Sequence, residues 1–225
     1  MITYYLRLVL ESDATFGRGD GVAGLVDEEI EYDPATGLPF LRGRTLKGLL
    51  TEECANLLYA ATNAPKLSDL QEAAKALFGG GGSTTSDDAQ MKIGHAELPQ
   101  ALRDAVRADV DRRAILPSDV LESLTAIRRQ TAMTPEGVPE DGSLRSMRVL
   151  LRGTELIAPL FFDTQPSPVM LALLGACAVG LRRAGTGRNR GRGKLTASLV
   201  DQDASSDLTE TQLEYFERIL KGAHP

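Results

Sequence analysis

The sequence predicts an α+β fold for this chain of 225 residues. Three observations carry the prediction. Short β-branched runs alternate with longer segments of helical period, turn residues separate the two kinds of run, and 42% of the residues are hydrophobic, which is enough for a sizeable core. With the insertions set aside, the order strand, helix, strands, helix, strand is compatible with a ferredoxin-like core in a single domain over residues 1–225.

The first ninety residues favour strand, loop and helix in turn. β-branched and aromatic residues favour a strand, and leucines repeated at three- and four-residue spacing favour a helix. The loop between them closes in a turn, because Pro34 presets φ and Gly37 permits a positive φ. The expected elements are a strand over 2–11, a loop over 16–39, helices over 45–61 and about 68–78, and a flexible Gly/Ser insertion near 79–90.

The rest of the chain repeats this alternation. Pro117 breaks a helical pattern, and Ser118 or Asp119 can cap a new start there. A cluster of prolines and glycines predicts an irregular stretch over 128–145. The other expected elements are a strand over 91–98, helical residues over 99–124, two strands within 147–162, an apolar helix over 168–184, a strand over 194–200 and an amphipathic helix over about 208–221.

Composition limits the functions and locations to be considered. Aromatic residues are only 5% of the chain and Trp is absent, which argues against wide stacking platforms for single strands. Cys54 and Cys177 lie in apolar helical patterns and are expected to be reduced core residues. The N-terminus is too short and too alternating for a signal peptide, and no apolar run reaches transmembrane length. We therefore expect a cytoplasmic protein with no membrane partner.

A basic, glycine-rich tract stands out in a chain of net charge -6. Residues 182–194, RRAGTGRNRGRGK, contain six basic residues and no acidic one. Glycines let a backbone approach a phosphate closely, and arginine forks bind phosphate oxygens bidentately, so the tract suits a sugar–phosphate chain. A nucleotide-binding P-loop fits poorly, because Leu195 stands where Ser or Thr is needed and Arg188 where the first glycine is needed.

A second glycine pattern, Gly19-x-Gly21-x-x-Gly24, matches the dinucleotide fingerprint and follows a strand. That fingerprint must open a helix. The residues that follow, LVDEEIEYDP, are β-branched and acidic and lead to a proline. The match is therefore interpreted as loop geometry.

Set beside the basic tract, two further stretches resemble the RAMP superfamily of CRISPR-associated proteins, most closely the repeated backbone subunits of type III effector complexes. The family has a Gly-x-x-Asp loop, a "thr-gly-leu-pro" turn, a "gly-ser-ser-leu-lys-gly" helix start and a late glycine-rich loop. Arg44-Thr45 replaces the small pair of the helix start. The matching stretches are GLVDEEIEYDPATGLPFLRGRTLKGLL (24–50), QTAMTPEGVPEDGSLRSMRVLLRGTELIAPLFF (130–162) and GTGRNRGRGKL (185–195), with LFGGGG (77–82) similar to the family's step before an insertion.

The resemblance implies an RRM-like core with inserted helical and thumb segments, the thumb lying near 128–145. It implies partners as well: a CRISPR guide RNA, a target RNA and other effector subunits, including further RAMP subunits. It also implies cleavage of target RNA by the Asp of the Gly-x-x-Asp loop, a position held here by Asp27. Such a carboxylate accepts the 2′-hydroxyl proton or holds Mg²⁺ or another divalent ion, with Asp20 and Glu28 as candidate helpers.

Basic residues beside glycine turns are expected to bind the guide backbone. A helix N-terminus adds its own N–H groups and positive dipole end to such a site. Contacts of this kind are independent of sequence and sensitive to salt. The expected RNA-binding residues are Arg42, Arg44 and Lys47 at the first helix start, Arg128, Arg129 and Arg145 beside the thumb, and Gly187, Arg188, Arg190, Gly191, Arg192 and Lys194 in the basic tract.

Three functions remain open at this point. The first is a type III backbone subunit that cleaves target RNA through Asp27. The second is a non-catalytic, architectural RNA-binding subunit of the same assembly. The third is a nucleotide-dependent enzyme that uses the glycine-rich loops. Guide processing by a histidine base is disfavoured, because His95 lies in a predicted strand and is interpreted as structural, and His224 lies in the tail.

Overall fold

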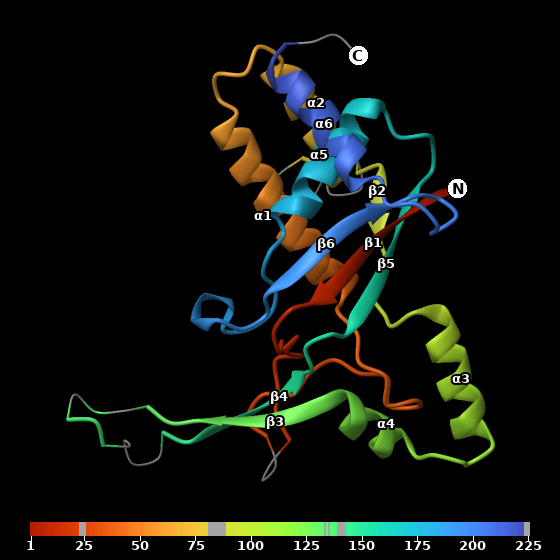
Figure 1. Ribbon diagram of the computed structural model, residues 1–225, viewed down its shortest axis with the longest axis vertical. Coiled ribbons are helices and arrows are strands. Elements are labelled where there is room, and N and C mark those ends of the chain that lie inside the picture. Colours follow the sequence, from red (N-terminus) through yellow and green to blue (C-terminus); the bar gives the residue numbers. More distant parts are fainter. Residues whose placement is uncertain (23–25, 81–88, 133, 135, 139–142, 223–225) are drawn as a thin grey trace.

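The computed structural model describes residues 1–22, 26–80, 89–132, 134, 136–138 and 143–222 (Figure 1). Its strands are β1 (Ile2–Leu10), β2 (Met91–Ile93), β3 (Thr125–Gln130), β4 (Arg145–Leu150), β5 (Glu155–Phe162) and β6 (Leu195–Val200). Its helices are α1 (Gly43–Ala60), α2 (Leu67–Phe78), α3 (Gln100–Asp111), α4 (Pro117–Leu124), α5 (Pro168–Gly180) and α6 (Thr209–Leu220), with a 3₁₀ turn at Arg188–Arg190. Gly24, most of the predicted Gly/Ser insertion and part of the predicted thumb lie outside the described residues.

A four-stranded antiparallel sheet in the order β2-β5-β1-β6 forms the centre of the fold. Because β5 is antiparallel to both of its neighbours, β1 and β2 run parallel with β5 between them, and α1 and α2 connect them. In the same way β5 and β6 run parallel on either side of β1, with α5 between them in sequence. These are two interlocked split βαβ units, so the predicted ferredoxin-like core is confirmed.

The core lies between one face of this sheet and the helices α1, α2, α5 and α6 (Figure 1). Alternate residues of β1, including Leu6 and Leu8, are fully buried, whereas Arg7 between them is exposed. α5 packs against α1, α2, α6 and β6 and is therefore apolar on nearly all sides. Each leucine buried in this way contributes about 1.5–3 kcal/mol relative to an exposed one. Cys54 and Cys177 are free and buried in this core.

The stretch 128–145 is only partly irregular, which corrects the prediction from its glycines and prolines. β3 and β4 form a separate antiparallel hairpin, with Thr125 opposite Leu150 and Gln130 opposite Arg145. The prolines and glycines fall between the two strands, so they mark the connection rather than the whole stretch. The hairpin projects sideways from the body of the molecule (Figure 1), and Arg128, Arg129 and Arg145 lie on its strands.

The predicted strand over 91–98 is shorter than expected. β2 ends at Ile93, opposite Leu160, and Gly94 then donates its N–H to the carbonyl of Pro159 at 2.9 Å. Pro159 has no N–H to return, so the regular ladder stops there. Isolated bridges at Ala96 and Glu97 follow. Within the described residues, no helix combines the length and the apolar character needed to cross a bilayer.

Candidate nucleic-acid interface

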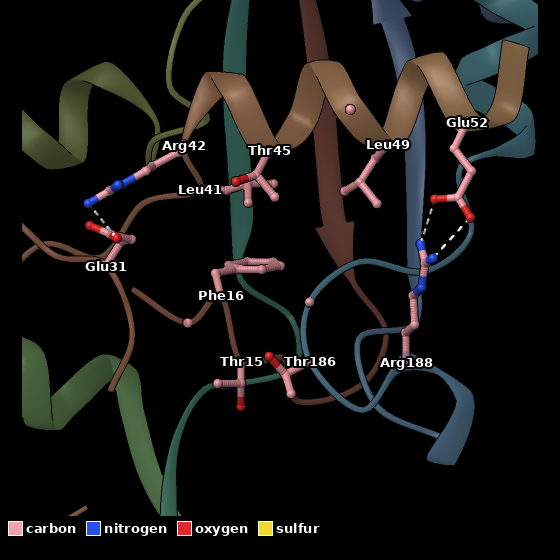
Figure 2. Close-up of a pocket in the computed structure, with 13 residues that line it drawn as sticks. Thr15, Phe16, Glu31, Leu41, Arg42, Thr45, Leu49, Glu52, Thr186 and Arg188 are labelled. Atoms are coloured by element: carbon pink, nitrogen blue, oxygen red, sulfur yellow. Dashed lines mark hydrogen bonds and ion pairs between the residues drawn. The ribbon is translucent and has the colours of Figure 1, made fainter. Parts of the chain in front are cut away.

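A cavity of about 360 Å³ lies between α1 and the glycine-rich loop that leads into β6 (Figure 2). We call it the α1 groove. Arg42, Thr45, Leu49 and Glu52 form its upper wall, because residues three or four apart share one face of a helix. Arg188 reaches the groove from the loop on the other side.

The predicted cations at the start of α1 divide between two faces of the helix. Arg42 lines the groove, whereas Arg44 and Lys47 do not. At 100° per residue, Arg44 and Lys47 share a strip that is turned away from the Arg42–Thr45–Leu49 face. The first N–H of the helix is also occupied, since Gly43 donates to Nδ1 of His95 at 3.1 Å. His95 packs against Phe40 as well, which agrees with its structural interpretation.

Glycines shape the loop opposite α1. Gly185 has φ +90°, and a Cβ there would lie 2.5 Å from the carbonyl oxygen of Thr15. Gly193 has φ +65°, and a Cβ there would lie 1.8 Å from the carbonyl oxygen of Ala184. Both positions therefore require glycine on conformational and steric grounds. Thr186 donates its N–H to the Thr15 carbonyl at 2.9 Å, which holds the loop against the segment after β1.

Carboxylates hold several of the predicted RNA-binding cations. The Arg188 guanidinium forms two parallel hydrogen bonds to Glu52, at 2.9 and 3.0 Å, which raise the pKa of Arg188 above its usual value (Figure 2). Arg42 Nη2 lies 2.7 Å from Oε1 of Glu31, a distance that suits an ion pair, but no donor among the described residues meets that buried oxygen with hydrogen-bond geometry. Arg128 pairs with Asp13 at 2.8 Å and Lys194 with Glu11 at 2.5 Å.

Sequence reasoning missed these four acidic partners. Three of them are far from their cation in sequence, so no local spacing identifies them. The other predicted cations, Arg44, Lys47, Arg129, Arg145, Arg190 and Arg192, form no ion pair within the part of the chain that the structure describes.

A second cavity, of about 380 Å³, lies on the other side of the glycine-rich loop, against the end of the hairpin at which Gln130 pairs with Arg145. We call it the Asp27 pocket. Thr186 lines both cavities, so the two share one wall. Asp20, Asp27 and Glu28 line it together with three predicted RNA-binding cations, Arg145, Arg190 and Arg192. The structure thus separates these three arginines from Arg42 and Arg188 and places them beside the predicted cleavage residue.

Ser146 of β4 holds the Asp27 carboxylate. Oδ2 of Asp27 accepts the Ser146 N–H at 2.6 Å and the Ser146 hydroxyl at 3.1 Å, and the Asp27 N–H donates to the Ser146 carbonyl at 2.9 Å. The bonds from Ser146 to the carboxylate lower the pKa of Asp27, with a smaller contribution from Arg145. Asp27 is therefore an exposed anion at neutral pH, which makes it a better cation ligand than proton acceptor.

The pocket suits a divalent ion that takes most of its ligands from water and substrate. Both Ser146 bonds to the carboxylate fall on Oδ2, so Oδ1 carries neither. No group of three or more His, Cys, Asp or Glu residues within the described ranges is arranged to hold a metal. Mg²⁺ keeps several waters and is commonly held by one or two carboxylates plus phosphates, so the Asp27 carboxylate would serve as one such ligand. Glu28 Oε1 already accepts a hydrogen bond from the Thr186 hydroxyl at 2.6 Å.

Neither glycine pattern has the surroundings of a nucleotide-binding loop. Val22 and Val26 bridge each other after Gly19 and Gly21, and the first helix of the described chain begins only at Gly43. The late glycine-rich loop passes through a 3₁₀ turn into a strand. Both motifs must precede a helix to bind a phosphate in the usual way.

Fold and site together define an α+β domain of ferredoxin-like topology with a basic glycine-rich loop packed beside its first helix. The RAMP superfamily model matches residues 8–196. The chain belongs to the RAMP superfamily, as the resemblance in its sequence implied. A search of curated proteins finds no significant match.

Two solved structures share the fold over nearly the whole chain. One is the type III-B Cmr-beta complex bound to cognate target RNA, in which a chain is 12% identical with a TM-score of 0.63, over 91% of this chain and 99% of that one. The other is the same type of complex in its apo state, with 13% identity and a TM-score of 0.62, over 90% of this chain and 98% of that one.

Proposed function

We propose that the chain is an RNA-binding backbone subunit of a type III CRISPR effector complex and that it cleaves target RNA at Asp27. One observation carries the proposal: a single glycine-rich loop separates a groove lined by arginines from a pocket that holds an ionised aspartate. Membership of the RAMP superfamily supports it, as does the fold shared with a chain of an RNA-bound type III-B complex. The expected location is the cytoplasm.

The α1 groove is the proposed place for guide phosphates. Arg42 and Arg188 line the groove, each paired with one of its two carboxylates, Glu31 and Glu52, which a phosphate would displace. The glycines fold the loop tightly against Thr15 and Ala184. Arginine and backbone contacts to phosphates carry no sequence information, so one groove can hold any guide. Arg44, Lys47, Arg128, Arg129 and Lys194 remain proposed phosphate contacts outside the groove.

The Asp27 pocket is the proposed place of cleavage. In cleavage by internal attack, the 2′-hydroxyl gives its proton to a water and its oxygen forms a bond to the adjacent phosphorus. The bond to the 5′-oxygen breaks, and that oxygen takes a proton from water, which leaves a 2′,3′-cyclic phosphate and a 5′-hydroxyl end. Arg145, Arg190 and Arg192 would stabilise the negative charge that develops on the phosphoryl oxygens. Mg²⁺, when bound to Asp27, would supply an acidic water and further positive charge.

The architectural alternative has an observation of its own in its favour. The Asp27 carboxylate already serves the structure, because it ties the loop to Ser146 on β4. An Asp27→Ala variant separates the two functions when it is assembled with its partner subunits and a guide. The cleavage proposal predicts normal target binding and no cleavage. Cleavage at the wild-type rate would leave only the architectural function.

The nucleotide-dependent alternative is tested by calorimetry with ATP and with NAD. The proposal predicts no measurable heat of binding for either nucleotide. Binding of one of them, abolished by a substitution in a glycine-rich loop, would favour the enzyme instead.

A further inference from the structure

A buried ion pair lies between the Asp27 loop and the hairpin. Glu29 is 1% exposed and Arg148 is 7% exposed. Arg148 Nε donates to Glu29 Oε1 at 2.8 Å, and its Nη1 donates to the Thr125 hydroxyl at 3.2 Å. Glu29 Oε1 also accepts the N–H of Ile30 at 2.9 Å. A buried charge pair survives only when hydrogen bonds of this kind satisfy it, so the geometry of the cluster is closely defined.

This ion pair and the Asp27–Ser146 contact both depend on the register in which residues 27–29 pair with β4. The segment around Glu28 runs parallel to β4, with Glu28 bridged to Met147. Ser146 lies two residues before Arg148, just as Asp27 lies two residues before Glu29, so the two contacts occupy the same face of the paired segments. Glu28 between them points the other way, and its carboxylate accepts the Thr186 hydroxyl.

Glu29 and Arg148 also hold the segment that follows β1, which includes Thr15, Arg18 and Asp20. The backbone of Glu29 accepts from the Arg18 N–H and donates to the Asp20 carbonyl, both at 3.0 Å. The carbonyl of Arg148 accepts the buried Thr15 hydroxyl at 3.1 Å. The ion pair thus lies where the segment before Asp27 meets the hairpin of β3 and β4.

We propose that Glu29 and Arg148 are positioning residues for the cleavage site, because their ion pair fixes the register in which Asp27 meets Ser146. The inference rests on the proposed cleavage at Asp27. Side chains alternate along extended segments, so a slip of one residue would break the Asp27–Ser146 contact and bring Glu28 opposite Ser146 in place of Asp27. The buried pair opposes that slip, since a slip would leave both of its charges without a partner.

An exchange of the pair for apolar residues tests this inference without leaving a lone buried charge. Glu29→Leu combined with Arg148→Met keeps volume and burial but removes the directed bonds. Glu155→Gln, which removes an exposed pair with Arg7 on the central sheet, serves as the surface control. Three quantities are measured on the assembled complex and the full chain: target-RNA affinity, the cleavage rate at saturating target, and hydrogen exchange at the Asp27 and Ser146 amides.

The inference predicts a split between binding and cleavage in the double variant. Target affinity stays within about twofold, while the saturated cleavage rate falls on the order of 100-fold, as expected for misplacement by about an ångström. Exchange at the Asp27 and Ser146 amides becomes about tenfold faster, and the surface control changes none of the three. A double variant with the wild-type rate and wild-type exchange would overturn the inference. So would an equal loss of binding and cleavage, because that is the signature of a structural role alone.

The exchange measurement keeps this inference separate from the proposed function. If the wild-type complex does not cleave target RNA, the proposed cleavage fails. The positioning inference is then decided by exchange at the Asp27 and Ser146 amides in the full chain. Faster exchange in the double variant alone supports the register role, and equal exchange in both proteins refutes it.

Discussion

The sharpest quantitative expectation concerns Arg188 in the α1 groove. If guide phosphates lie in this groove as proposed, replacing Arg188 with Ala removes one phosphate contact and also frees Glu52 from its ion pair. A hydrogen bond to a charged group contributes about 1.5–3 kcal/mol. The ion pair with Glu52 competes with this phosphate contact. The side chains of Arg188 and Glu52 are 38% and 49% exposed, so their ion pair offsets only about 0–1 kcal/mol of the phosphate contact. The net loss is about 0.5–3 kcal/mol, or roughly 2- to 150-fold in guide affinity.

Fluorescence anisotropy of a labelled guide RNA, titrated at several salt concentrations, measures this loss. One phosphate contact fewer lowers the slope of log affinity against log salt by about 0.7 for a single strand. Glu52→Gln removes the competing carboxylate and should tighten binding by up to about fivefold. Arg112→Ala, which breaks an exposed pair with Asp109 on α3, is the matched control. An Arg188→Ala variant with unchanged affinity and slope would refute the assignment of guide phosphates to this groove.

Three further expectations follow from the site and its supports. Because Ser146 lowers the pKa of Asp27, this carboxylate stays ionised above its ordinary value of 3.8. A pH–rate profile should therefore show no Asp27 titration between about pH 5 and 8, and a titration of the Asp27 side chain in that range, followed by NMR, would contradict the reasoning. Gly193→Ala should destabilise the chain in urea by more than the roughly 1–3 kcal/mol of backbone strain expected for Gly191→Ala, which has the same strain but open space; equal losses would be unexpected. Glu29→Ala should cost about 3–5 kcal/mol by leaving Arg148 uncompensated, and a loss below 1 kcal/mol would show that the pair is not buried in solution.

The elements of the fold were largely predictable from the sequence because their signals are local. Leucine spacing in α1 and the apolar character of α5 identify helices without any knowledge of their partners. The hairpin of β3 and β4 was only partly recognised. Its two strands are stabilised mainly by pairing with each other, which leaves a weak signal in the sequence of either strand. The glycines and prolines of the connection between them gave the stronger local signal. β2 was predicted too long because its end is set by Pro159, on a strand more than sixty residues away in sequence.

The candidate site was less predictable, because most of its contacts join residues that are distant in sequence. Residue types and glycine turns identified the basic tract and Asp27, but not the division of the arginines between two cavities. Arg44 and Lys47 were grouped with Arg42 by sequence proximity, whereas helix geometry turns them to another face. The carboxylate partners Glu31 and Glu52, and the buried pair of Glu29 with Arg148, bring together residues that are distant in sequence, apart from the short step from Glu31 to Arg42.

In the proposed function, this chain binds guide RNA within a larger assembly. The most direct measurement is to purify the chain with its neighbouring subunits, extract the bound nucleic acid and sequence it. With no Trp and five Tyr, the protein absorbs weakly at 280 nm, so sequencing is more informative than an absorbance ratio. The account predicts short RNAs that share a repeat-derived end and are lost when Arg42 and Arg188 are both replaced with Ala. An assembly free of nucleic acid would contradict the account and reduce the relation to the RAMP superfamily to one of fold.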